Sequence, residues 1–308
     1  MDLLRYNLGE GVEAFTTRRD SVLPYPVIQP HQTHSANVAV IDRPDYSREE
    51  LEGVDALVTN LKNVAIGVRT ADCIPVLLYD PVSRCVGAAH SGWRGTINKI
   101  AAQTVLAMIK NYGAKPSDMR AVIGPGICID NFQVGEDVAQ LFKASGFPVD
   151  KIWSFRGPRT EGSLEGGHHI DLFEVCRITL LECGVAESNI QVCGICTYNN
   201  PDFFSARREG ADCGRNINAI TLLRSLVNVT VLSGKLRGVV FLVRMNLFRV
   251  DQILGRENRI LRPGRTAKSA SFSQYSKWTG YGRWCSGCLS ARSRTRFRTA
   301  SLQKCALS

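Results

Sequence analysis

The sequence predicts an α/β fold, because short strand-like runs alternate along the chain with segments of helical periodicity. The chain has 308 residues, of which 44% are hydrophobic and 8% aromatic, as in a globular protein large enough to bury an extensive core. The predicted strands cover residues 37–41, 64–68, 74–79, 85–89, 121–123 and 190–195. The predicted helices cover residues 97–112, 135–145 and 171–184.

Capping signals support these helices. Gly113 and Gly146 supply C-terminal stops, and Asp171 with Glu174 has the spacing of a capping box. The stretch 149–167 is rich in Gly and Arg, and it predicts a long surface loop.

The positive charge of the chain is concentrated at its C-terminal end. The formal net charge is +10. From Leu226 onward the sequence holds sixteen Lys or Arg and two Asp or Glu, a balance of +14, so residues 1–225 carry −4. This distribution argues against a nucleic-acid partner for the first 225 residues. We therefore expect a catalytic domain over residues 1–225 and a basic, poorly ordered extension over residues 226–308.

The sequence shows no recognisable export or membrane signal. The N-terminus lacks an apolar stretch followed by a small-residue cleavage site, which favours a cytoplasmic location. The eleven cysteines are then expected to be reduced thiols. Lys235, Arg237 and Arg244 interrupt the apolar stretch 226–248, so we expect no membrane partner.

Two residues with reactive side chains flank a predicted hairpin. Residues 74–79 and 85–89 are joined by a four-residue turn, which predicts two antiparallel strands. If Tyr79 faces Arg84 across the turn, the same register places Cys73 opposite His90. Directly opposed side chains have Cβ atoms about 4.5–5.5 Å apart, close enough for a thiolate and an imidazole to share a proton or a metal ion.

The other histidines give weaker signals. His31 and His34 are three residues apart in a loop, but an H-x-x-H spacing alone is a weak metal signal, and either residue could be structural. His168 and His169 follow two glycines, and we interpret them as loop or hydrogen-bonding residues.

Six motifs occur in an order that is similar to one protein family. They are Q-T-H-S at 32–35, T-A-D-C-I-P-V-L-L at 70–78, A-H-S-G-W-R-G-T at 89–96, I-G-P-G-I at 123–127, C-T-Y at 196–198 and F-S-A-R-R-E-G at 204–210. Together they resemble the laccase-domain, or multicopper polyphenol oxidase, family. This family also goes under the names purine nucleoside phosphorylase and peptidoglycan editing factor. The resemblance implies a three-layer α/β/α domain with a mixed β-sheet, similar to the cytotoxic necrotizing factor-like cysteine hydrolase fold.

The resemblance also implies a zinc site, formed by His34, Cys73 and His90. Asp72 is the nearest acidic candidate for proton transfer or for support of the ligands. Phosphorolysis needs cations that hold phosphate, and the candidates are Arg69, Arg94 and Arg208.

Three functional interpretations remain open. The first, which we favour, is a zinc-dependent purine nucleoside phosphorylase that binds phosphate and nucleosides such as adenosine, inosine and methylthioadenosine, with adenosine deaminase activity. The second is a cysteine hydrolase or amidase acting on a cell-wall precursor, in which His90 deprotonates Cys73. The third is a copper-dependent polyphenol oxidase. Copper would suit the donors, but a multicopper enzyme needs more histidines than the five in the chain.

Overall fold

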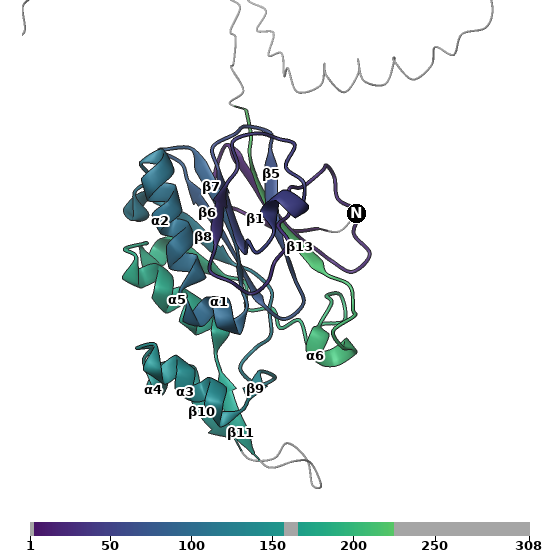
Figure 1. Ribbon diagram of the computed structural model, residues 1–308, viewed down its shortest axis with the longest axis vertical. Helices are drawn as coiled ribbons and strands as arrows, with labels where there is room; N and C mark the ends of the chain where they lie inside the picture. The colour runs from purple at the N-terminus through teal and green to yellow at the C-terminus, as the bar shows by residue number, and fades with distance from the viewer. Residues whose placement is uncertain (1–2, 157–165, 225–308) are drawn as a thin grey trace, which may run out of the picture. The chain divides into compact units, whose positions relative to one another are not determined.

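The computed structural model describes residues 3–156 and 166–224 (Figure 1). The expectations for the basic extension, residues 226–308, therefore lie outside the described residues, as does the middle of the predicted loop 149–167. No helix in the described ranges is both long enough and apolar enough to cross a bilayer.

A six-stranded sheet forms the centre of the fold. Its two outer strand pairs are parallel and its inner pairs are antiparallel, which confirms the prediction of a mixed sheet. The strand order is β12 (Ile190–Val192), β8 (Arg120–Ile123), β6 (Ile74–Asp80), β7 (Cys85–Ser91), β4 (Ala56–Thr59) and β3 (Val38–Val40).

Helices cover one face of this sheet (Figure 1). Val76 and Leu78 of β6 point to this face and belong to the same buried cluster as Ile100 and Met108. The helices on this face are α1 (Trp93–Ile97), α2 (Ile100–Tyr112) and α5 (Leu172–Glu182). The helices α3 (Glu136–Ala144) and α4 (Val149–Ile152) lie instead beside the strands β11 (Gly167–Ile170) and β10 (Trp153–Arg156), and the short α6 (Ala206–Glu209) lies elsewhere (Figure 1). As predicted, the Asp171 side chain accepts the N-capping hydrogen bond of Glu174.

A second sheet covers the opposite face, and this corrects the expected α/β/α arrangement. Its strands are all antiparallel, in the order β1 (Leu3–Tyr6), β2 (Val12–Thr17), β13 (Asn216–Leu222) and β5 (Ala65–Thr70). Leu77 and Tyr79 of β6 pack in one buried cluster with Ile66 and Ile220 of this sheet. The described layers are thus helices, a mixed sheet and an antiparallel sheet. Of this sheet the sequence predicted β5 alone. The strands β1, β2 and β13 were missed, as was β4 of the central sheet; β2 and β13 were missed because Thr and Asn make their composition less apolar than that of central strands.

Two local predictions were also wrong. The single helix predicted over 97–112 is divided, because Lys99 adopts a left-handed conformation with φ 56° between α1 and α2. The expected loop 149–167 contains α4 and a strand, β10 (Trp153–Arg156). This strand pairs with β11 (Gly167–Ile170), which in turn pairs with β9 (Gln133–Val134).

The predicted hairpin exists, but its register differs by two residues. Tyr79 pairs with Val86 and Pro75 pairs with His90, because Arg84 lies in the turn with φ 51° and does not pair. A shift of two residues leaves every side chain on its predicted face. Cys73, which directly precedes β6, therefore lies diagonal to His90 and on the same face of the sheet.

Candidate metal centre and cavity

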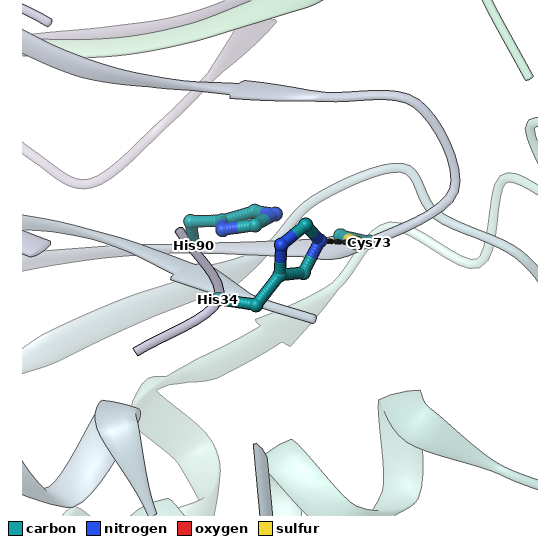
Figure 2. Close-up of side chains that lie close together, drawn as sticks. All are labelled: His34, Cys73 and His90. Atoms are coloured by element: carbon teal, nitrogen blue, oxygen red, sulfur yellow. Dashed lines mark hydrogen bonds between the residues drawn. The ribbon is translucent and has the colours of Figure 1, made fainter. Parts of the chain in front are cut away.

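Three side chains from separate segments converge at the end of the β6–β7 hairpin (Figure 2). One donor atom each from His34, Cys73 and His90 lies within 4.8 Å of the other two. The Cys73 Sγ lies 3.9 Å from the His34 Nε2, and the two imidazole rings meet edge to face with centroids 4.9 Å apart. The structure thus brings together the three residues expected to form a zinc site.

The His34 loop is held in place by a buried carboxylate, that of Asp55. The carboxylate accepts hydrogen bonds from the backbone N–H groups of Thr33, His34 and Ser35 at 2.7–3.1 Å, and from the Ser35 hydroxyl at 2.8 Å. These bonds keep His34 in a left-handed conformation with φ 62°, which non-glycine residues rarely adopt. Strain of this kind persists where the surroundings impose it and is common at functional sites.

Asp55 also orients His90. The His90 Nδ1 lies 2.7 Å from the Asp55 Oδ1, so the Nε2 is the ring nitrogen that is free to face Cys73 and His34. Burial opposes the charge of Asp55, but hydrogen bonds from His90 and Ser35 lower its carboxyl pKa to about 2. Burial likewise favours neutral His90, but Cys73 and Asp55 raise its pKa to about 9.

The Cys73 thiol has thiolate character. Burial alone would raise its pKa, but the charge of His90 and hydrogen bonds from His34 and His90 lower it to about 6. A thiolate is the form that binds metal ions and the form that acts as a nucleophile. The environment therefore suits both chemistries.

Asp72 occupies the bend before Cys73, with φ 88°. One of its carboxylate oxygens accepts from the Thr197 hydroxyl at 2.7 Å, and the other accepts from the Arg207 backbone N–H at 2.6 Å. Both oxygens therefore connect the Cys73 segment to the distant residues 197–207.

The three donors face a cavity of about 850 Å³. Its wall includes four arginines, Arg48, Arg69, Arg207 and Arg215, together with Asp72, Ile127 and Phe132. Arg207 donates to the backbone carbonyls of Asn131 and Gln133. Arg215 donates to the backbone carbonyls of Ala211 and Gly214.

Arg48 and Arg69 differ from the other two cavity arginines. Within residues 3–156 and 166–224, neither guanidinium has an ion pair or a hydrogen bond. The backbone of Arg69 is fixed by two 2.8 Å hydrogen bonds to the Gln32 side chain, which couples β5 to the His34 loop. Burial and the positive charges of Arg48 and Arg215 lower the pKa of Arg69. The cavity therefore has a wall of excess positive charge.

The structure does not bring the other two predicted arginines to the cavity wall. Arg94 is exposed and stacks on the Trp93 ring, with its guanidinium carbon 4.2 Å from the ring centroid. Arg208 donates to the carbonyls of Thr197, Tyr198, Asn200 and Phe203 at 2.5–3.2 Å.

The remaining histidines have partners outside the donor cluster. His31 pairs with Glu52 at the rim of the cavity. His168 accepts a hydrogen bond from the Trp153 indole at 3.0 Å, and His169 Nδ1 lies 2.7 Å from the Ile129 carbonyl. Both are strand residues of β11, so the loop alternative was wrong, whereas the alternative prediction that they are hydrogen-bonding residues is confirmed.

The donor set fits a metal ion such as zinc. Zinc bonds of about 2.0–2.1 Å to nitrogen and 2.3 Å to sulfur place tetrahedral donors roughly 3.3–3.6 Å apart. The observed separations, 3.9 Å between Cys73 and His34 and no more than 4.8 Å between any two of the three donors, are somewhat longer and would shorten on binding. A carboxylate on the second nitrogen of a ligating histidine is the usual support of such sites, and Asp55 is placed in this way on His90.

Several residues of the site were not predicted from the sequence. Asp55 carried a usable signal, since a charged residue directly before the apolar strand β4 is out of place unless it has partners. Gln32 lay inside a recognised motif without an assigned role. Arg48 and Arg215 lie in polar segments that resemble ordinary surface, so no local signal marked them.

Comparisons with known proteins agree with the motifs. The family described as multi-copper polyphenol oxidoreductase laccase matches residues 12–223. A purine nucleoside phosphorylase from Bacteroides thetaiotaomicron is 38% identical over 227 residues, which cover 69% of this chain and 82% of the relative. An adenosine deaminase, RL5, from an unknown prokaryotic organism is 42% identical over 203 residues, which cover 63% of this chain and 74% of the relative.

Solved structures have the same fold. YlmD from Geobacillus stearothermophilus superimposes with a TM-score of 0.61 at 25% identity, covering 73% of this chain and 97% of YlmD. A Neisseria meningitidis protein superimposes with a TM-score of 0.60 at 27% identity, covering 73% of this chain and all of that protein. The resemblance expected from the six motifs is thus confirmed, and the chain belongs to the multi-copper polyphenol oxidoreductase laccase family.

Proposed function

We propose that this protein is a zinc-dependent purine nucleoside phosphorylase that also deaminates adenosine. Its substrates would be phosphate and nucleosides such as adenosine, inosine and methylthioadenosine. The observation that carries the proposal is the position of His34, Cys73 and His90 on a cavity of about 850 Å³, within the usual size range of a small-molecule site. The names of the relatives from Bacteroides thetaiotaomicron and of RL5 support the same activities.

His34, Cys73 and His90 would hold the ion. A zinc ion with three protein ligands keeps one position open, where it polarises a substrate group or lowers the pKa of water. Asp55 holds the proton on the His90 Nδ1, so that the Nε2 is the nitrogen that would lose its proton and bind the ion. Asp72 fixes the bend that presents Cys73, through its bonds to Thr197 and Arg207.

Phosphate would bind at the positive wall of the cavity. Arg48 and Arg69 have unpartnered guanidinium groups among the described residues, and a phosphate oxygen could accept from each of them. Arg215 adds positive charge, although its guanidinium is engaged by the carbonyls of its own loop. Arg69 keeps the role expected from the sequence, whereas Arg48 and Arg215 take the places proposed for Arg94 and Arg208.

The test combines metal analysis with phosphate dependence. The purified protein should carry one zinc per chain, and inosine should yield hypoxanthine and ribose 1-phosphate in proportion to added phosphate. Cys73→Ala should lose both the metal and these activities, whereas Cys213→Ala, which removes another thiol of the same cavity, should keep both. A rate of purine release that changes neither with added phosphate nor with a chelator would contradict the proposal.

A cysteine hydrolase is the second candidate, and one observation favours it. Cys73, His90 and Asp55 form a thiol, imidazole and carboxylate series, with the pKa of Cys73 lowered to about 6. The likeness to a cysteine hydrolase fold, and a cell-wall amide as substrate, remain predictions. An acylated Cys73 that forms equally well after chelation would favour this candidate over the phosphorylase.

A copper-dependent polyphenol oxidase ranks third. The donor set would accept copper, and the family carries the multi-copper name. Within residues 3–156 and 166–224, however, the three-donor group is the single cluster of its kind, whereas a multicopper mechanism requires several ions.

A further inference from the structure

Two cysteines that are 68 residues apart in sequence lie side by side at the end of the central sheet. Cys128 follows β8 and Cys196 follows β12, the parallel neighbour of β8. Beyond the strands, Gly126 still pairs with Cys196: the Gly126 N–H donates to the Ile195 carbonyl at 3.2 Å, and the Thr197 N–H donates to the Gly126 carbonyl at 2.9 Å. This pairing fixes the two backbone segments against each other.

The two sulfur atoms share hydrogen-bond donors. The Cys128 backbone N–H donates to the Cys196 Sγ at 3.2 Å. The Asn131 side-chain amide lies 3.2 Å from the Cys128 Sγ and 3.3 Å from the Cys196 Sγ. Both cysteines are partly exposed, so a small reagent can reach them.

We propose that Cys128 and Cys196 form a reversible disulfide, which fastens the segments after β8 and β12 to each other. A disulfide requires two sulfurs on adjacent backbone segments that can approach to about 2.05 Å. The Gly126–Cys196 pairing and the shared Asn131 amide provide that arrangement before any bond forms.

The spacing of the sequence would suggest a different pair. Cys193-Gly194-Ile195-Cys196 is a C-x-x-C motif, the pattern of thiol redox proteins. Here, however, Gly194 turns the chain with φ 66°, and burial raises the pKa of Cys193 to about 11. The structure therefore favours Cys128 over the nearer Cys193 as the partner of Cys196.

The environment also assigns the order of the reaction. Burial would raise the pKa of Cys196, but hydrogen bonds from Cys128 and Asn131 lower it, while burial and Cys196 raise the pKa of Cys128. The Cys196 thiolate attacks a low-molecular-weight disulfide, whose S–S bond breaks to release one thiol and leave a mixed disulfide. Cys128 then loses its proton to solvent and attacks the Cys196 sulfur, releasing the second thiol. The protein loses two electrons and the small disulfide gains them.

The Cys128–Cys196 disulfide would lie next to the cavity. Ile127 lines the cavity and donates its backbone N–H to the Asp72 carbonyl at 2.8 Å, and Thr197 donates its hydroxyl to the Asp72 carboxylate. Each of these residues adjoins one cysteine of the pair. The disulfide would therefore restrain Ile127 and Thr197, the two residues that hold Asp72 in the bend before Cys73.

The full-length protein, equilibrated in glutathione buffers of increasing oxidised fraction and then alkylated, gives a direct test by peptide mass spectrometry. We expect a Cys128–Cys196 cross-linked peptide that disappears on reduction, together with a rise in Tm of roughly 5 °C or more. Cys183 and Cys193 lie in the same tryptic peptide as Cys196. The double variant Cys183→Ser with Cys193→Ser removes both competing thiols and should leave the cross-link and the Tm shift in place.

Either of two mass-spectrometric results would overturn the proposal. One is a Cys193–Cys196 cross-link as the main oxidised product. The other is the absence of any Cys128 cross-link at every buffer ratio, with mixed glutathione adducts instead. Cys128→Ser and Cys196→Ser should each abolish the Tm shift, and a shift that survives either variant would also refute it.

Discussion

The two sides of the cavity are built in opposite ways. On the donor side, Asp55 is fully buried and accepts five hydrogen bonds, which fix both His34 and His90 before any ion binds. On the arginine side, Arg48 and Arg69 leave their guanidinium groups unpartnered within the described residues. The first side is preorganised by its own hydrogen bonds, and the second retains charge that only a ligand can neutralise.

This difference has a physical basis. A metal centre requires donors fixed within a few tenths of an ångström, so its supporting bonds belong to the folded protein. An anion that enters and leaves is better served by cations that are not already paired, because no internal ion pair must break first. Changes on the donor side should therefore alter stability and metal binding, and changes on the arginine side should alter ligand binding alone.

The largest effect is expected from Asp55→Asn. The carboxylate of Asp55 accepts hydrogen bonds through both oxygens, whereas the Asn amide would turn an N–H₂ group toward some of the same N–H donors. Those buried donors would lose their acceptor. We expect a loss of about 3 kcal/mol in the free energy of unfolding and a 10–100-fold loss in zinc affinity. Denaturant titration and competition with a chelator measure the two quantities. Asp212→Asn, an exposed carboxylate on the same cavity, is the matched control and should change neither.

Arg208→Ala should come next, because this arginine belongs with the preorganised groups. Its guanidinium donates to four backbone carbonyls of the segment 197–203, which would lose their partner together. We expect a loss of about 2 kcal/mol in the free energy of unfolding, measured by denaturant titration. Arg5→Ala removes an exposed arginine that is paired with Glu13 and should leave stability unchanged. An equal effect of both variants would show that the carbonyl contacts contribute little.

The sequence predicted the donor side well because local rules determine it. Side chains alternate between the two faces of a strand, so the sequence predicts that Cys73 and His90 lie on the same face of the sheet. This prediction remained correct although the predicted register was wrong by two residues. His34 was assigned through a motif, since a loop histidine has no periodicity that reveals its position. Asp55 needed the tertiary structure, because its five donors come from two separate segments.

The arginine side and the second sheet were harder to predict. Arg69 and Arg215 meet because β13 pairs with β5 across about 150 residues, and no local pattern encodes that pairing. The same pairing formed the second sheet in place of the expected helical layer. Arg94 and Arg208 lay in stronger motifs than Arg48, but their side chains are engaged elsewhere.

Acidification should weaken the donor side selectively. The folded pKa of Asp55 is lowered to about 2, below its ordinary value near 4, so its contribution to stability is complete above about pH 4. That contribution is lost as the pH falls from about 4 through 2, at a cost of about 2 kcal/mol. Urea titrations of the metal-free protein across this range should show the decline. In the Asp55→Asn variant the decline should be smaller by the same amount, and an unchanged slope would contradict the assignment.

The arginine side should respond in binding and not in stability. Arg69→Gln keeps the length and polarity of much of the side chain but removes a charge that already lies beside Arg48 and Arg215, so the fold should tolerate it. Under the proposed function, KM for phosphate should rise about tenfold, equivalent to about 1.4 kcal/mol, whereas deamination of adenosine, which needs no phosphate, should keep its rate. Arg94→Gln removes an arginine outside the cavity wall and should leave both activities unchanged. If Arg69→Gln slows deamination as strongly as phosphorolysis, or lowers Tm, then Arg69 supports the site as a whole, and the contrast between the two sides fails.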